Sequence, residues 1–257
     1  MRALLASPLG FLIGVSLGAL GGGGSILAVP ALVYAAGQSP KQATTTSLVL
    51  VTITALTGIV PHWRAGRVRL VAGTVFGAAG VGGSLLGSSW NKSADPNVLL
   101  LAFSGVMLVA ASAMWRRSAR SAEPAAGQRP TVVSASTVIK VVVAGTGVGL
   151  LTGFFGVGGG FVIVPALVLA LGFDMPHAVG TSLLVIAINS LVALSSRLHG
   201  GSVEWRTVIP FTIASLGGVV VGSRLASTRQ PRLLQRWFVG LLVAVAMYTA
   251  IRSIVSL

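Results

Sequence analysis

The stretch "LGALGGGGSILAVPALV" at residues 17–33 decides the fold, because it sets four consecutive glycines and Pro30 inside an apolar segment. A helix is expected there, yet a glycine in a helix interior costs about 1 kcal/mol. A proline also lacks a backbone donor. As one straight helix, residues 4–36 would extend about 50 Å, whereas the hydrocarbon core of a membrane is about 30 Å thick. The sequence therefore predicts a helix that breaks at its glycines.

The composition indicates an integral membrane protein. Of the 257 residues, 54% are hydrophobic and only 9% are charged, whereas about a quarter of a typical soluble domain is charged. The apolar segments lack the alternation of barrel strands, so we expect an all-α, polytopic transmembrane helical bundle. Residues 4–20 are expected to belong to this bundle rather than to a cleaved signal peptide. The chain has no cysteine, which excludes disulfides and thiolate metal sites.

The net charge of +14 is concentrated in short basic clusters between the apolar segments. These clusters are Arg64, Arg67 and Arg69, then Arg116, Arg117 and Arg120, then Arg224, Arg229, Arg232 and Arg236. Clusters in such positions orient membrane proteins by the positive-inside rule, and this distribution excludes nucleic-acid binding. Attraction of an anionic solute or an anionic lipid is a second use of the same charge.

The chain is a tandem repeat with a constant offset of 135 residues. The sequence "TGFFGVGGGFVIVPALV" at residues 152–168 aligns without a gap with residues 17–33. The same offset pairs Thr46 and Ser47 with Thr181 and Ser182. The alignment predicts a single membrane domain, residues 1–257, with a first repeat at 1–115, a cytoplasmic linker at 116–137 and a second repeat at 138–257.

Each repeat is expected to contain one glycine-broken piece followed by three plain transmembrane helices. The broken pieces are residues 4–36 and 139–171; the plain pieces are 43–61, 68–89 and 97–115, then 178–196, 206–223 and 233–254. A broken piece can cross the membrane as a discontinuous helix or return as a re-entrant hairpin. Equivalent loops of the two repeats carry opposite basic bias, which favours inverted repeats and hence a hairpin plus three spans. The alternative is parallel repeats with four crossings each.

Three features resemble the sulfite exporter TauE/SafE family of membrane transporters. They are the repeated glycine run before Pro-Ala-Leu, the Ala-x-x-Thr-Ser pattern at Ala43 and Ala178, and the loop "GGSVEW" at residues 200–205. The first repeat departs from this loop by carrying Arg69 at the position equivalent to Glu204. The resemblance covers the chain apart from the linker. It implies a secondary transporter of small sulfur-containing anions, such as sulfite, sulfoacetate or other organosulfonates, in the bacterial inner membrane.

We expect the broken helices to hold the anion. The N-terminus of a half-helix presents unpaired N–H groups and about half a positive charge, without a titrating side chain. Glycines would let an anion approach that backbone, and hydroxyl and amide groups would add donors. The expected substrate-binding residues are Gly21, Gly23, Gly24, Ser25, Thr46, Ser47, Gly156, Gly158, Gly159, Thr181, Ser182 and Asn189.

Several of these patterns also have a structural interpretation. The Thr-Ser pairs are expected near the start of a helix, where they could cap it. Asn189 could bond a neighbouring helix. The glycines that are expected to serve close helix packing are Gly14, Gly18, Gly149 and Gly153. The histidines, which lie at segment ends and match no metal-site spacing, are expected to be solvated: His62, His177 and His199.

The sequence does not predict an enzyme, a cofactor or a metal site. It holds four acidic residues, all expected in loops and none paired for acid–base chemistry. Facilitated diffusion and coupling through the protonation of the substrate itself both stay open. The expected partners are a small anionic substrate and the lipid bilayer, with no nucleic acid, and a homodimer is compatible with the sequence. The rival functions are transport of another small solute and a non-transporting membrane scaffold.

Overall fold

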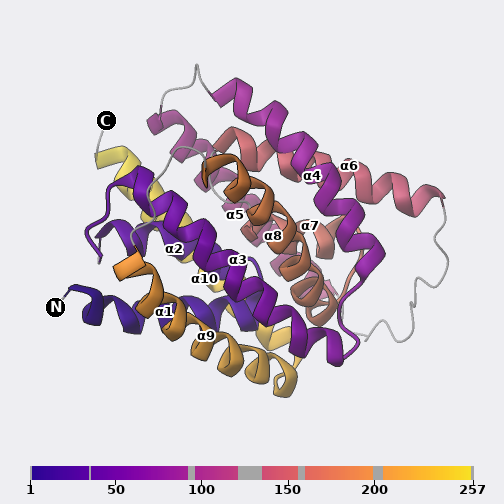
Figure 1. Cartoon of the computed structure of the whole chain (residues 1–257). Helices are drawn as coiled ribbons and strands as arrows, with labels where there is room; N and C mark the ends of the chain where they lie inside the picture. Colours follow the sequence, from indigo (N-terminus) through magenta and orange to yellow (C-terminus); the bar gives the residue numbers. More distant parts are fainter. Residues whose placement is uncertain are drawn as a thin grey trace.

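The computed structural model describes residues 2–34, 36–91, 96–120, 135–155, 160–198 and 205–255 (Figure 1). Within these ranges the chain forms ten helices and no strand, which confirms the predicted all-α class. The first repeat contains α1 (Arg2–Leu20), α2 (Gly23–Tyr34), α3 (Pro40–Arg64), α4 (Leu70–Asn91) and α5 (Pro96–Arg120). The second contains α6 (Ala135–Phe155), α7 (Gly160–Leu169), α8 (Met175–Leu198), α9 (Trp205–Thr228) and α10 (Pro231–Val255).

The helix boundaries follow the sequence repeat. The helices α3, α4 and α5 begin at Pro40, Leu70 and Pro96, and α8, α9 and α10 each begin 135 residues later. The expected break separates α1 from α2 at Gly21 and Gly22, where Gly21 has a φ of +68°. That left-handed conformation favours glycine because other residues lose energy there. In the second repeat, α6 ends at Phe155 and α7 begins at Gly160.

Each broken helix packs against the opposite repeat. Helix α1 lies along α9, and α6 lies along α4 (Figure 1). A Cβ atom at Gly14 would lie 2.0 Å from the backbone oxygen of Ser215, and one at the equivalent Gly149 would lie 2.1 Å from that of Gly80. Gly18 and Gly153 make the same close approach one turn further on. The prediction that these four glycines serve helix packing is therefore confirmed.

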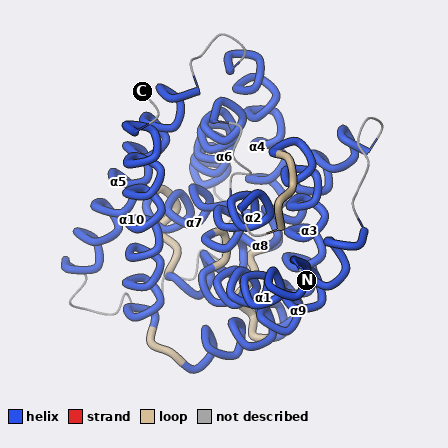
Figure 2. The backbone as a smooth tube through the Cα atoms, turned by 90° about the vertical axis from the view of Figure 1, so that its left-hand side faces the viewer, coloured by secondary structure: helices blue, strands red, loops and turns tan. Residues whose placement is uncertain are grey.

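The two short helices α2 and α7 lie in the middle of the bundle, surrounded by the longer helices (Figure 2). Nearly all of α7 is buried, including Phe161, Ile163 and Leu167. Large apolar side chains face outward from the longer helices, with Leu85 68% exposed and Ile213 64% exposed. Such a surface suits lipid rather than water.

Six helices in the described ranges are long and apolar enough to cross a bilayer. Their spans are Gln42–Arg64, Leu70–Ser88, Ser136–Phe155, Met175–Ser195, Val208–Thr228 and Pro231–Ile251. The shorter apolar helices Pro8–Leu20, Gly23–Val33 and Gly160–Leu169 all belong to the broken pieces.

We predict that Gly14→Ala lowers the stability of the protein by about 1–3 kcal/mol, because the new methyl group would collide with the backbone of α9. The measurement is the midpoint of thermal unfolding in detergent, followed by size-exclusion chromatography. Gly105→Ala is the matched control, since nothing lies within 4 Å of its Cβ position. Equal midpoints for the two variants would contradict the close packing of α1 on α9.

Candidate functional site

The breaks of the two repeats are brought together at the start of α2 and α7. A Cβ atom at Gly22 would lie 1.4 Å from the backbone oxygen of Gly160. A Cβ atom at Gly160 would lie 2.2 Å from the hydroxyl oxygen of Ser25. Ser25 and Gly160 are equivalent positions of the two repeats, so the first turns of α2 and α7 cross where the repeats meet. We call Gly21, Gly22, Ser25 and Gly160 the break junction.

The first turns of α2 and α7 thus lie together in one buried region. The first four N–H groups of a helix have no partner within it, and the helix dipole places partial positive charge there. Residues 17–24 are buried, as is the whole first turn of α7. This arrangement can accept an anion through backbone donors, without a charged side chain.

Aromatic rings flank the break junction. Phe103 of α5 makes edge-to-face contacts with Phe155 and Phe161, with ring centroids 5.6 and 4.8 Å apart. Phe238 of α10, the repeat equivalent of Phe103, lies 3.6 Å from the Cβ position of Gly23. Both side chains are buried. Sequence reasoning missed this pair, although the offset of 135 residues connects them.

A hydroxyl of α8 also reaches the break junction. The Oγ atom of Ser182 lies 2.3 Å from the position that a Cβ atom would take at Gly21. The equivalent contact in the other repeat would join Ser47 to Gly156. Gly156, Gly158 and Gly159 all lie outside the described residues.

The other predicted site residues lie further away or face other groups. The Cβ position of Gly24 faces the backbone of α1 at Ile13, and that of Gly23 faces Leu241. Asn189 lies beside Gly80 of α4, seven residues along α8 from Ser182, which is about 10 Å of helix rise. Its Oδ1 atom is buried and has no hydrogen-bond partner among the described residues.

The interpretation of the Thr-Ser pairs as helix caps is wrong. Helix α3 begins at Pro40 and is capped by Ser39, which forms a capping box with Gln42. Thr46 and Ser47 therefore lie in the second turn, as do Thr181 and Ser182 in α8. All four side chains are buried.

Most of the serine hydroxyls already donate to a nearby carbonyl. Ser25 donates to Gly22 over 2.7 Å, and Ser47 and Ser182 donate to the carbonyl three residues earlier over 2.8 Å. Thr181 instead accepts a hydrogen bond from the backbone N–H of Arg69 over 3.1 Å. Its own hydroxyl proton is then left for another acceptor, so Thr181 can donate a hydrogen bond to an anion.

Thr181 belongs to a polar cluster formed by both repeats. The Nη2 atom of Arg69 lies 3.5 Å from Nε2 of His177, whose Nδ1 atom lies 2.5 Å from a carboxylate oxygen of Asp174. We call Arg69, Asp174, His177 and Thr181 the polar cluster. Partial burial would raise the pKa of Asp174, but the hydrogen bonds from His177 and the nearby positive charges outweigh it and hold that pKa below its ordinary value.

The expectation that the histidines are solvated is wrong for His62, which is buried, and holds only in part for His177, which is partly buried. His62 is 2% exposed, and its Nε2 atom lies 3.1 Å from the backbone oxygen of Gly18. His177 is partly buried in the polar cluster. His199 lies outside the described residues. No group of three possible metal ligands occurs in the described part of the chain.

The loops that carry arginines meet at one end of the bundle, which we call the basic end. Arg67 of the α3–α4 loop donates to Ala226 at the end of α9 over 3.4 Å. Arg117 of α5 donates to Val168 of α7, and Gln235 of α10 donates to Met114 of α5. The polar cluster lies at this end, because Arg69 follows Arg67 in the same loop.

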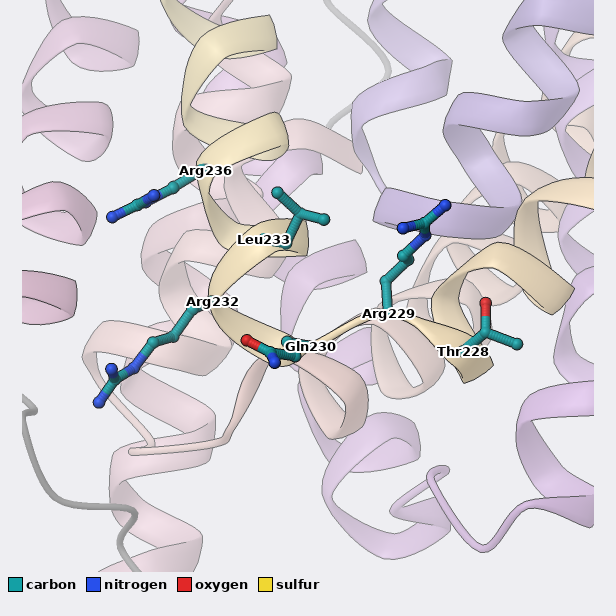
Figure 3. A pocket seen from close by; sticks show the side chains of 6 residues that line it. All are labelled: Thr228, Arg229, Gln230, Arg232, Leu233 and Arg236. Carbon is teal, nitrogen blue, oxygen red and sulfur yellow. The ribbon is translucent and has the colours of Figure 1, made fainter.

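The basic end also has a shallow hollow at the α9–α10 turn. It is lined by Thr228, Arg229, Gln230, Arg232, Leu233 and Arg236. The arginine side chains point apart, with Arg229 on one side and Arg232 and Arg236 on the other (Figure 3). Because they do not converge, this hollow is a basic surface rather than a formed binding site.

The chain is similar to known proteins over most of its length. The sequence profile described as "Sulfite exporter TauE/SafE" matches residues 6–249. A "Probable membrane transporter protein" of Xylella fastidiosa (strain 9a5c) is 36% identical over 96% of this chain and 95% of its own length. The "Probable membrane transporter protein YdhB" of Bacillus subtilis (strain 168) is 25% identical over 92% of this chain and 95% of its own length. No solved structure matches the chain.

We predict that Gly22→Ala destabilises the protein by more than about 2 kcal/mol, because its methyl group would overlap the backbone of Gly160. Gly23→Ala is the matched control, since the one close contact of its methyl group is with the flexible end of Leu241, and we expect a loss of stability within about 0.5 kcal/mol. Thermal unfolding in detergent measures both. If the two neighbours tolerate alanine equally, the two breaks do not touch as described.

Proposed function

The chain belongs to the sulfite exporter TauE/SafE family of membrane transporters, and we propose that it carries small sulfur-containing anions across the bacterial inner membrane. The substrates are sulfite, sulfoacetate or other organosulfonates. Transport is secondary, and the anion is held near the midplane by the N-termini of the broken helices.

The crossing of α2 and α7 at the break junction is the observation that carries this proposal. An anion that leaves water needs donors to replace its hydration shell. A buried arginine or lysine would supply them but would also hold the anion strongly. Helix N-termini supply donors and partial charge without a full cation, and two of them meet where the glycines permit close approach to the backbone.

The close packing of the glycines also supports the alternative of a membrane scaffold that does not transport. Gly22 is needed for the contact with Gly160 whether or not an anion binds. Packing does not account for Thr181, which is buried and keeps a hydroxyl proton to donate. The hydroxyl of Thr181 therefore favours a binding role over a scaffold.

The helix directions support the inverted arrangement that the charge bias predicts. Helices α4 and α8 run parallel, because Gly73 contacts Leu184 and Gly77 contacts Ile188. The short loop at residues 65–69 turns the chain between α3 and α4, which therefore run in opposite directions. Helix α8 then runs opposite to α3, its own repeat equivalent. Parallel repeats with four crossings each would give the two equivalents the same direction.

Energy coupling does not use a carboxylate inside the bundle in this proposal. Among the residues that the structure describes, the single acidic residue is Asp174, which lies in the α7–α8 loop at the basic end. Transport of the anion is then either facilitated diffusion or coupled to protons. In the coupled case, the proton binds to the anion itself or to a group outside the hydrocarbon region.

We predict that the purified protein in proteoliposomes takes up labelled sulfite and methanesulfonate, and that Thr181→Val reduces the uptake about tenfold. One lost hydrogen bond to a charged group is worth about 1.5–3 kcal/mol, which corresponds to at least a tenfold change. Thr74→Val is the matched control, because the exposed hydroxyl of Thr74 bonds only to its own helix. Absence of uptake by the unchanged protein would refute anion transport and favour the scaffold. Full uptake by Thr181→Val would exclude that residue from the path.

We predict that single cysteines at positions 69 and 229 of the cysteine-free chain are labelled from the same side of the membrane, the cytoplasmic one. A membrane-impermeant maleimide on inverted and right-side-out vesicles distinguishes the sides. A cysteine at position 205, at the opposite end of α9, serves as the control and is expected on the other side. Labelling of positions 69 and 229 from opposite sides would favour parallel repeats.

A further inference from the structure

We propose that the polar cluster is a second anion site, at the basic end, and that proton uptake by His177 releases Arg69 to bind the anion there. This inference rests on the proposed anion transport and names the group that links it to protons. The anion is a small oxyanion of the sulfonate class, which first binds to Arg69 and Thr181 before it moves to the break junction.

We assign His177 a neutral ring from its two side-chain contacts in the polar cluster. Arg69 can only donate, so the Nε2 atom that faces it at 3.5 Å must act as the acceptor. The proton of the neutral ring then lies on Nδ1, which donates to Asp174 over 2.5 Å. Asp174 also accepts from the backbone N–H of His177 over 3.2 Å, as in a helix cap, while its contact with Nδ1 orients the ring. Asp174 is thus a positioning residue, and His177 is the acceptor for Arg69.

Protonation of His177 breaks this arrangement. A proton that binds at Nε2 removes the acceptor and places two cations side by side, which repel each other. Asp174 stays ionised, because its carboxyl group has a lowered pKa, and it keeps its hydrogen bond to Nδ1. The guanidinium of Arg69 is therefore the group that moves, and a nearby anion offers it a new partner. Proton uptake and anion binding then favour each other.

The polar cluster and the break junction are adjacent along α8. Thr181 lies one helical turn beyond His177, and its hydroxyl oxygen is held by the backbone N–H of Arg69. The next residue, Ser182, places its hydroxyl against Gly21. An anion bound by Arg69 and Thr181 thus lies beside the helix that forms the wall of the break junction.

The first repeat lacks a titratable counterpart of His177. The positions equivalent to Asp174 and His177 are Ser39 and Gln42, which form an ordinary capping box. The second repeat therefore keeps the function of a helix cap but builds it from groups that exchange protons. A cap alone does not require this change, because Ser39 and Gln42 already satisfy it.

The other charged or titratable groups near His177, outside the polar cluster, are hydrogen-bonded to backbone oxygens rather than to the His177 ring. Within the described residues, Arg67 and His62 lie beside Gly180, the residue before Thr181, and Arg117 lies near Gly172, two residues before Asp174. Arg67 is engaged with Ala226, His62 with Gly18, and Arg117 with Val168. Arg69 is the cation in direct contact with the ring of His177.

The test measures initial uptake of methanesulfonate by the full chain in proteoliposomes, with the same pH on both sides. Methanesulfonate keeps its single charge between about pH 5.5 and 7.5, the range in which histidines change charge. We expect its apparent KM to fall at least about fivefold from pH 7.5 to 5.5, the lower range of a typical coupling between two ligands.

Three variants test whether His177 and Arg69 couple proton uptake to anion binding or only stabilise the fold. The double variant D174S/H177Q copies the cap of the first repeat, so it is expected to fold and to transport with a KM that no longer depends on pH. Arg69→Gln is expected to raise the KM about tenfold at pH 5.5 and only about twofold at pH 7.5, where His177 already engages Arg69, with little change in kcat. Arg224→Gln, at an exposed arginine of the same end, is the control and should keep the pH dependence.

The outcomes distinguish this inference from the proposed function. A wild-type KM that does not change with pH, or an unchanged pH dependence in D174S/H177Q, would overturn the inference while anion transport stands. A KM of Arg69→Gln equal to that of the wild type would also overturn it. If the wild-type protein carries neither sulfite nor methanesulfonate, the proposed function fails and the inference fails with it.

Discussion

The structure depends on one constraint: a helix that breaks inside a membrane domain must find other partners for its backbone. In hydrocarbon, each unpaired N–H or C=O costs several kcal/mol, so irregular backbone is tolerated only when protein or a water-lined cavity surrounds it. Here the break of one repeat is covered by the break of the other, through the contact of Gly22 with Gly160. Neither break is complete without its partner, which explains why both occur in one chain and in equivalent positions.

The same dependence extends along the whole of each broken helix. Helix α1 packs on α9 and α6 packs on α4, so each repeat contributes its broken helix to the other one. The close approach at Gly14 and at Gly149 lets backbone meet backbone in both pairs. An isolated repeat would expose these glycine faces to lipid, where they have no partner. The two repeats therefore form a single packing unit, although the sequence reads as two similar halves.

The sequence predicted the helices, their breaks and the glycines that pack closely, but not which helices meet. The helix boundaries, the break at Gly21 and the packing role of Gly14 follow from composition, hydrophobic length and the repeat. The exchange of partners does not, because the repeat offset says which positions are equivalent but not which helix each one meets. The cap at Ser39 was missed because the apolar pattern begins some residues after the helix does. The contact of Arg69 with His177 joins residues more than a hundred positions apart, and no local pattern carries that information.

The charged side chains and the break junction lie in different parts of the molecule. The arginines can attract an anion to the basic end, whereas the break junction would bind it without a charged side chain. The arginines in the described loops gather at the basic end, where water screens them and the cost of a full charge is low. The break junction holds no charged side chain; its positive potential comes from the helix ends and is about half a unit charge at each. An anion that moved from the basic end to the break junction would exchange a full positive charge for two fixed and weaker helix dipoles. Because the proposed interior site has no full charge to neutralise, it can be empty without leaving a buried arginine unpaired, which a transporter requires each time its substrate departs.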